Sequence, residues 1–187
     1  MQRLMVASLM CFAFSTFECL SVAQGHQYTS RKYRFSLEVP MGWRYGRSAS
    51  EGLPLIINLQ WSQLQPQLDL PKGGAIIHMI SEEGLPEPNG SYTLEEWAEF
   101  DERAGVSETV SSRALSLPKE TGISRAIMAS FDEKTYSPSE QRQHQTAVYW
   151  DFRGRRFAAY LNFIVGDPKA KEYRDTLLEI MRSFRPE

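Results

Sequence analysis

The chain has 187 residues, of which 42% are hydrophobic and 24% are charged, and its formal net charge is -2. These values are typical of a globular protein and exclude wholesale disorder. The 21 Lys and Arg residues are balanced by 23 Asp and Glu residues, so no basic excess favours a polyanion. We therefore expect a globular domain that has no nucleic-acid partner.

Residues 1–23 have the features of a secretory signal peptide. Arg3 supplies a positive start, residues 4–17 are uncharged and mostly apolar, and the small residues Ser21 and Ala23 predict cleavage near Ala23. The apolar run is shorter than the about 20 residues that a spanning helix needs, although an uncleaved anchor remains the alternative. We expect an exported protein, periplasmic or secreted, with no stable membrane span after cleavage.

The cysteine count has a direct consequence for the exported form. Cys11 and Cys19 both lie in the predicted signal peptide. The cleaved protein would therefore contain no disulfide, no thiol nucleophile and no thiolate metal ligand. Its hydrophobic core would have to stabilise the fold alone.

The first half of the remaining chain predicts strands followed by a helix. We expect residues 24–30 to form a short disordered lead and residues 31–187 to form a single domain. The alternation of apolar and polar residues predicts strands at 32–39, 54–61 and 75–81. A helix is expected to begin at Thr93, because Thr93 and Glu96 have the spacing of a capping box, and to end at Gly105.

The second half predicts more strands and a final helix. Strands are expected at 108–117 and 122–131, and a hairpin at 143–165 turns around Arg153 and Gly154. Residues 168–184 have one apolar stripe, which predicts a helix that packs on a sheet. The fold class is therefore α+β, an α/β/α sandwich around a largely antiparallel sheet of six to seven strands.

Three groups of residues resemble a known family. They are VPMGW at 39–43, TLEEW at 93–97, and the strand at 157–165 followed by DP at 167–168 and a helix ending in IMRSF at 180–184. In this order they resemble the PsbP-like family, whose fold is seen in the photosystem II subunit PsbP, a Ran-binding nuclear factor and DcrB-like bacterial envelope proteins. The resemblance implies a mostly non-enzymatic protein that docks on other proteins. It carries over no metal or partner residue, because these motifs serve packing and capping.

Motifs for catalysis are not found in the sequence. There is no G-x-S-x-G and no H-E-x-x-H, and His26, His78 and His144 have no histidine at i+4. A site built from His78, His144 and an Asp would require their strands to be adjacent. The acids of the first helix, among them Glu96 and Asp101, are expected to be solvated. We expect no enzymatic activity, no cofactor and no metal.

Two surface features are candidates for contact with a partner. Arg153, Arg155 and Arg156 bracket the tip of the predicted hairpin, where they could hold an acidic partner or lipid head groups. Trp43, which follows a strand in a turn, is the candidate for an exposed aromatic residue at an interface. A solubilising turn and core packing are the competing interpretations.

The sequence therefore favours an exported, non-catalytic binding or accessory protein of the bacterial cell envelope that acts through protein–protein contacts with an unidentified envelope protein. One alternative is a hydrolase that uses carboxylate or His chemistry. Another is a protein that binds a small apolar ligand or an apolar segment between sheet and helix, which requires a pocket of several hundred Å³.

Overall fold

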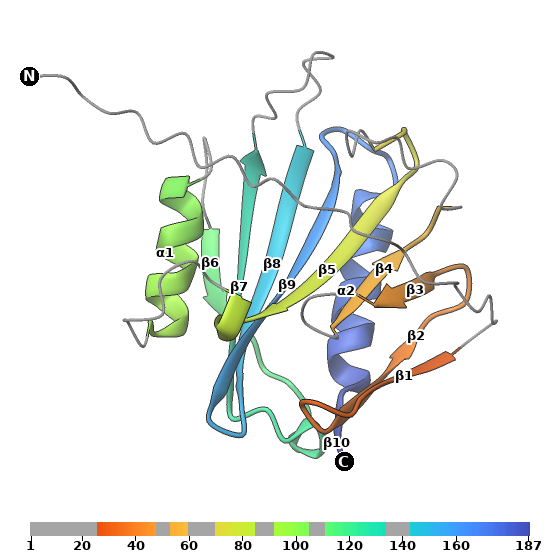
Figure 1. Cartoon of the computed structure of the whole chain (residues 1–187). Coiled ribbons are helices and arrows are strands. Elements are labelled where there is room, and N and C mark those ends of the chain that lie inside the picture. The colour runs from red at the N-terminus through yellow and green to blue at the C-terminus, as the bar shows by residue number, and fades with distance from the viewer. Residues whose placement is uncertain (1–25, 48–52, 60–69, 85–91, 105–110, 134–142) are drawn as a thin grey trace, which may run out of the picture.

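The computed structural model describes residues 26–47, 53–59, 70–84, 92–104, 111–133 and 143–187. The predicted signal peptide lies outside these residues. Most of the described chain belongs to one large sheet with helices beside it (Figure 1). The order of strands, helix, strands and helix follows the expectation from the sequence, with three additional short strands.

The large sheet has seven strands in the order β3-β4-β5-β9-β8-β7-β6, and every neighbouring pair is antiparallel. Its strands are β3 (Arg44–Arg47), β4 (Pro54–Ile57), β5 (Ala75–Ser81), β6 (Ser111–Ala114), β7 (Arg125–Glu133), β8 (Gln143–Phe152) and β9 (Arg155–Ile164). The long β8–β9 hairpin lies at the centre, and both of its residues with positive φ, Arg153 and Gly154, form the turn. The expected antiparallel sheet is confirmed.

A second sheet of three strands corrects the expectation for the N-terminal residues. Its strands are β1 (His26–Ser30), β2 (Phe35–Val39) and β10 (Arg185–Pro186), in the order β1-β2-β10. The prediction of a disordered lead was wrong for residues 26–30, because β1 pairs with β2 along its whole length. Tyr28 and Ser30 are buried there, so a hairpin partner gives this short segment its order.

The two helices cover opposite faces of the large sheet. Helix α1 (Leu94–Ala104) packs on alternate residues such as Ala129 and Tyr149, whereas α2 (Ala170–Ser183) packs on the other set, such as Val148. The predicted capping box is present: the Thr93 N–H donates to Glu96 Oε2 at 2.7 Å, and the Glu96 N–H donates to Thr93 Oγ1 at 3.2 Å. The α/β/α arrangement is therefore confirmed, with the small sheet beside α2.

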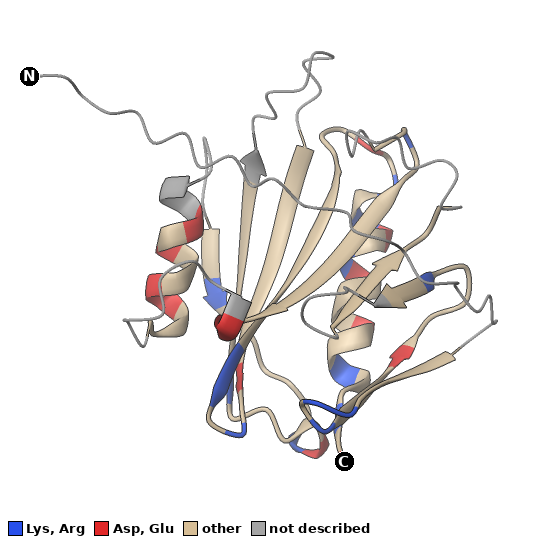
Figure 2. Cartoon of the chain, viewed as in Figure 1, with Lys and Arg blue, Asp and Glu red and all other residues tan. Residues whose placement is uncertain are grey.

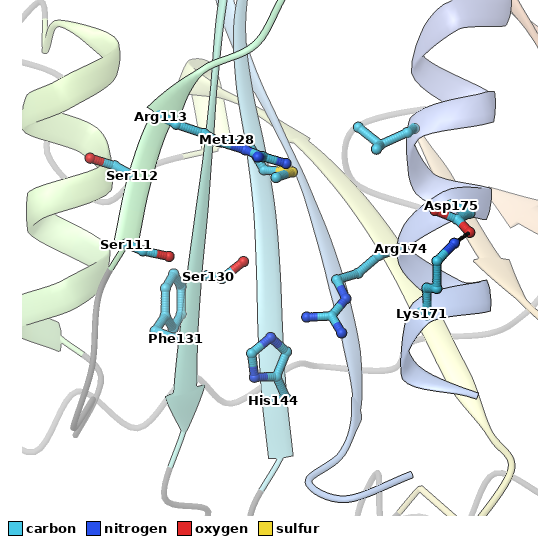
Figure 3. Close-up of a pocket in the computed structure, with 11 residues that line it drawn as sticks. Ser111, Ser112, Arg113, Met128, Ser130, Phe131, His144, Lys171, Arg174 and Asp175 are labelled. Atoms are coloured by element: carbon cyan, nitrogen blue, oxygen red, sulfur yellow. Dashed lines mark hydrogen bonds and ion pairs between the residues drawn. The ribbon is translucent and has the colours of Figure 1, made fainter. Parts of the chain in front are cut away.

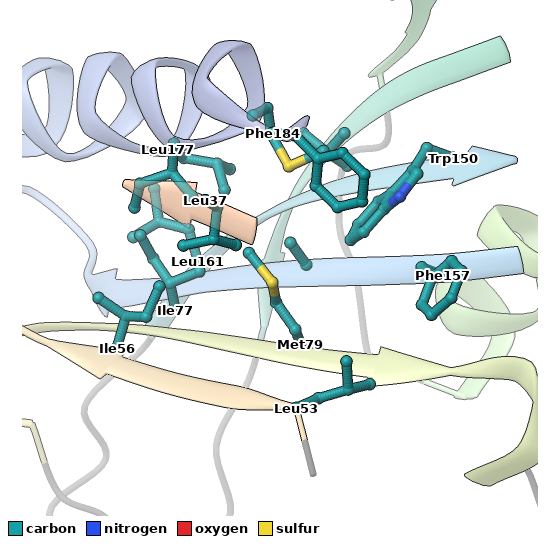
Figure 4. Close-up of a cluster of buried hydrophobic side chains, with 14 of the residues drawn as sticks. Leu37, Leu53, Ile56, Ile77, Met79, Trp150, Phe157, Leu161, Leu177 and Phe184 are labelled. Carbon is teal, nitrogen blue, oxygen red and sulfur yellow. The ribbon is translucent and has the colours of Figure 1, made fainter. Parts of the chain in front are cut away.

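The main core lies between the large sheet, the small sheet and α2 (Figure 4). Phe184, the first residue after α2, has no exposed surface and stacks on Phe35 of β2 with ring centroids 4.4 Å apart. Its edge also meets Phe152 at 4.9 Å and Trp150 at 6.0 Å, both on β8. This aromatic cluster joins the end of α2 to both sheets.

Replacing Phe184 should test this role of the cluster. Phe184→Ala removes a fully buried ring that meets three aromatic rings on β2 and β8, so we expect a loss of about 3–5 kcal/mol in the free energy of unfolding. Met41, which is 84% exposed, provides the control, and Met41→Ala should change stability by less than about 0.5 kcal/mol. Urea unfolding followed by tryptophan fluorescence measures both, and equal losses would contradict the assignment.

Candidate functional site

The three arginines predicted as a contact surface are engaged within the chain. Arg155 forms an ion pair with Glu83, and Arg156 Nη1 lies 3.0 Å from Glu82 Oε2. Arg153 donates to the backbone carbonyls of Glu187 at 2.8 Å and Arg34 at 3.3 Å. Figure 2 shows the basic residues of the β8–β9 turn, close to a second group of basic residues at the β1–β2 turn. Their use by a partner stays a prediction, and such a partner would compete with these internal contacts.

The expectation of an exposed Trp43 was wrong. Only 8% of this residue is exposed, and its ring meets Tyr173 of α2 edge-on with centroids 6.2 Å apart. The turn before it places Met41 in solvent and directs Trp43 back onto the helix. Trp43 therefore belongs to the core between α2 and the start of β3.

The structure does not bring His78 and His144 together. In the sheet β9 lies between β5, which carries His78, and β8, which carries His144. His78 is opposite Tyr160 and His144 is opposite Phe163, three residues further along β9. Because successive side chains alternate between the faces of a sheet, the two histidines lie on opposite faces. One site containing both is excluded.

Each histidine has a different environment. Burial lowers the pKa of His78 to about 4, so its ring is neutral at pH 7. His144 lies on the α2 face, where its Nε2 is 3.4 Å from the hydroxyl of Thr146 and its ring is 5.0 Å from that of Phe163. Among the described residues, no group of three His, Cys, Asp or Glu side chains is placed to hold a metal ion.

Asp101 corrects the expectation that the acids of α1 are solvated. Its Oδ2 accepts hydrogen bonds from the Tyr149 hydroxyl at 2.7 Å and the Tyr160 hydroxyl at 2.6 Å. Burial raises the pKa of this carboxyl, and the two hydrogen bonds oppose that shift. The carboxylate joins α1 to β8 and β9, which makes it a structural group of that face.

A groove of about 650 Å³ lies on the other face, between α2 and the strands β6, β7 and β8 (Figure 3). It is lined by Ser111, Ser112, Arg113, Met128, Ser130, Phe131, His144, Lys171, Arg174, Asp175 and Leu178. Ser111 pairs with Ser130 and Arg113 pairs with Met128 in the β6–β7 register, so these four side chains share the face toward α2. The remaining wall comes from one side of the first turns of α2.

Positive charge predominates in this groove. Lys171 Nζ lies 2.6 Å from Asp175 Oδ2, so the acid of the groove is neutralised by its neighbour on the helix. Arg113 and Arg174 have no ion pair with any described residue, in contrast to Arg125, Arg155 and Arg156. Figure 3 shows their side chains extending from opposite walls, Arg113 across β7 and Arg174 from α2 toward Ser130 and His144.

Hydroxyl groups line the sheet side of the groove. Ser130 Oγ is 3.4 Å from Thr146 Oγ1, which in turn is 3.4 Å from His144 Nε2. Thr146 is fully buried beneath this surface, whereas Ser111 is exposed at the edge strand. Guanidinium and hydroxyl groups around an open space are the donors that bind anions in proteins.

Sequence reasoning did not find this groove. Arg113 lies in a weakly patterned segment, and Arg174 lies some distance along the chain on the charged side of the last helix. Only the β6–β7 register and the position of α2 bring the two arginines to one space. The residues that flank Arg113 and Arg174 in the sequence contain no motif that predicts a shared site.

Comparisons with known proteins give a fold and no family. No protein-family model and no curated protein matches the sequence. Among solved structures, the chain is similar to LpqN of Mycobacterium tuberculosis, a protein involved in cell envelope biogenesis, at 14% identity and a TM-score of 0.53, covering 87% of this chain and 90% of LpqN. It is also similar to PA94 of Pseudomonas aeruginosa, a protein of unknown function, at 11% identity and a TM-score of 0.50, covering 88% and 99% of the two chains.

The PsbP of Synechocystis sp. PCC 6803 (CyanoP) matches as well, at 11% identity and a TM-score of 0.46, covering 93% of this chain and 99% of CyanoP. At these identities the likenesses to LpqN and PA94 show the fold alone, and the predicted α+β architecture is confirmed. In the part of the chain that the structure describes, no helix is long and apolar enough to cross a membrane.

The buried His78 predicts how stability depends on pH. Its pKa in the folded state, about 4, is below the ordinary histidine value of 6.5, so the unfolded chain binds the proton more tightly. Stability should therefore fall as the pH falls from 6.5 to 4, by up to about 3 kcal/mol.

His78→Leu removes this titration and should flatten the loss between pH 7 and pH 4.5, as measured by urea unfolding at both values. Asp175→Asn, which changes a carboxylate that is 59% exposed, serves as the control and should keep the full loss. The raised pKa of Asp101 makes its contribution to stability increase as the pH falls, which is opposite to the effect of His78. Both variants keep Asp101, so this contribution cancels when their pH dependences are compared. An undiminished loss in His78→Leu would contradict the assignment.

Proposed function

We propose that this protein is an exported, non-catalytic binding protein of the bacterial cell envelope, and that it holds a small acidic ligand in the groove between α2 and strands β6–β8. The observation that carries the proposal is the convergence of Arg113 and Arg174 from opposite walls on one open space. Export is the expectation from residues 1–23. LpqN, which has the same fold, is involved in cell envelope biogenesis, and this supports a role in the same compartment.

The groove suits a small ligand. Sites for small molecules are typically about 300–1,000 Å³ in volume, and this groove of about 650 Å³ falls within that range. It is mixed in character, because Met128 and Leu178 lie beside the cationic groups. This favours an acidic ligand with an apolar part over the purely apolar ligand that the sequence suggested as an alternative.

The walls of the groove are held by backbone hydrogen bonds and by core packing. Ladder hydrogen bonds hold β6, β7 and β8 together, and α2 buries Leu177, Ile180 and Met181 in the core. The carboxylate of Asp167 fixes the start of the helix, accepting hydrogen bonds from the N–H of Lys169 at 2.8 Å and from the N–H of Gly73 at 2.8 Å. A preorganised site loses little conformational entropy when it binds a ligand.

The groups of the groove favour binding over hydrolysis. The carboxylate of Asp175 is engaged by the ammonium group of Lys171, 2.6 Å away, so it is not free to act on a ligand. The hydroxyl of Thr146, which lies 3.4 Å from His144 Nε2, belongs to a fully buried residue and could not reach a bound substrate. These contacts support a site that holds its ligand without transforming it.

A fluorescent anion tests whether the groove binds ligands. The probe is 8-anilinonaphthalene-1-sulfonate, which combines an acidic group with aromatic rings. We expect saturable binding to the folded protein, weakened by added salt because the attraction is electrostatic. Ser111→Trp, at the rim of the groove, should weaken binding at least about tenfold, and Ser130→Trp should give the same result from the floor.

The matched control is Ser124→Trp, which places the same side chain at an exposed position of the chain outside the groove. It should leave binding of the probe unchanged, and circular dichroism should show that all three variants are folded. Equal binding by the groove variants and the control would overturn the proposed site, as would the absence of saturable binding to the wild-type protein.

A second test addresses the hydrolase alternative. With p-nitrophenyl acetate and p-nitrophenyl phosphate, the release of p-nitrophenol should equal that in buffer, and His144→Ala should not alter it. The measurement is absorbance over time at several pH values. Turnover above buffer that disappears in His144→Ala would contradict the non-catalytic assignment and favour a hydrolase.

A further inference from the structure

Resting on the proposed function, we infer that the groove recognises an organic phosphate, namely a phosphate monoester whose dianionic head lies between Arg113 and Arg174 and whose apolar part lies on Met128 and Leu178. The charge of the groove selects an anion. Its lining contains three cationic side chains, those of Arg113, Lys171 and Arg174, against the single carboxylate of Asp175. The whole chain, in contrast, has a net charge of -2.

The two arginines are available to a ligand. Arg125, Arg155 and Arg156 each have an acidic partner within the chain, and Arg153 donates to two carbonyls. Neither Arg113 nor Arg174 has such a partner among the described residues. Figure 3 shows both guanidinium groups directed into the space between the sheet and α2.

The arrangement of donors favours phosphate over carboxylate. A carboxylate offers two coplanar oxygens and a single negative charge, so two guanidinium forks from opposite walls would have to share its four in-plane lone pairs. A phosphate monoester has three terminal oxygens and a charge of about -1.5 to -2 at pH 7. It can therefore accept from both forks, and from a serine hydroxyl such as that of Ser130, at the same time.

The apolar residues determine where the remainder of the ligand lies. Met128 is 9% exposed on the floor of the groove, and Leu178 packs at the edge of the core from the side of α2. Both lie beside the arginines, so a short alkyl or aromatic group attached to the phosphate would cover them. Each methylene of the ligand that is buried on these side chains should strengthen binding by about fourfold.

Displacement of 8-anilinonaphthalene-1-sulfonate by chosen competitors tests the inference. The competitors are monohexyl phosphate, inorganic phosphate, hexanoate and hexanol. We expect monohexyl phosphate to displace the probe at concentrations at least about tenfold lower than inorganic phosphate or hexanoate, and hexanol to be ineffective. Calorimetry with monohexyl phosphate then gives the affinity directly.

Variants of the two arginines provide the matched comparison. Arg113→Gln and Arg174→Gln should each weaken the binding of monohexyl phosphate by about tenfold or more, because each removes a charge-assisted pair. Arg182→Gln makes the same charge change at an exposed position near the end of α2 and should have little effect. Equal effects of all three variants would reduce the attraction to net charge and would overturn the inference.

Vesicles distinguish a free phosphate from a lipid head group. If the natural ligand is a lipid, the protein should sediment with vesicles of equal parts phosphatidic acid and phosphatidylcholine, and Arg174→Gln should abolish this. If only monohexyl phosphate binds, the ligand is a free organic phosphate. Both outcomes support the inference. Binding of the fluorescent probe without displacement by monohexyl phosphate, or equal displacement by hexanoate, would overturn it and leave the proposed function standing.

Discussion

The structure depends on how α2 packs against the large sheet. The helix buries one stripe, and Phe184 closes its end by stacking on Phe35 and meeting the aromatic rings of β8. Because α2 packs mainly on β2 and β9, the outer strands β6 and β7 of this face are left uncovered beside the helix. The groove is therefore a consequence of the packing: a rigid helix cannot cover the whole width of a twisted sheet.

Residues of one type have different roles in this protein because their neighbours differ. Arg155 and Arg156 at the β8–β9 turn are neutralised by Glu83 and Glu82, which follow β5. Lys32 also contacts Glu83, and the hydrogen bond from Lys32 lowers the pKa of that carboxyl. The arginines of the groove face hydroxyls and apolar side chains instead. A count of charges along the sequence cannot make this distinction, since the neutralising acids are distant in the chain.

The same reasoning applies to the acids and aromatic residues. Asp101 has the helical position of a surface acid, yet two tyrosines from adjacent strands bury its carboxylate. Trp43 follows a turn, a place typical of exposed residues, yet it packs on Tyr173 of α2. In both cases the partner comes from an element that is far away in sequence. A local pattern has no access to such a partner.

The order and type of most elements follow from the sequence, because alternation, the capping box at Thr93 and Glu96, and the apolar stripe of the last helix are local properties. Local patterns missed β1, β3 and β10, whose order comes from pairing with β2 and β4. The candidate site is likewise a product of tertiary structure. Strand register and helix placement determine that Arg113 and Arg174 face one space, and both depend on the packing of the whole core.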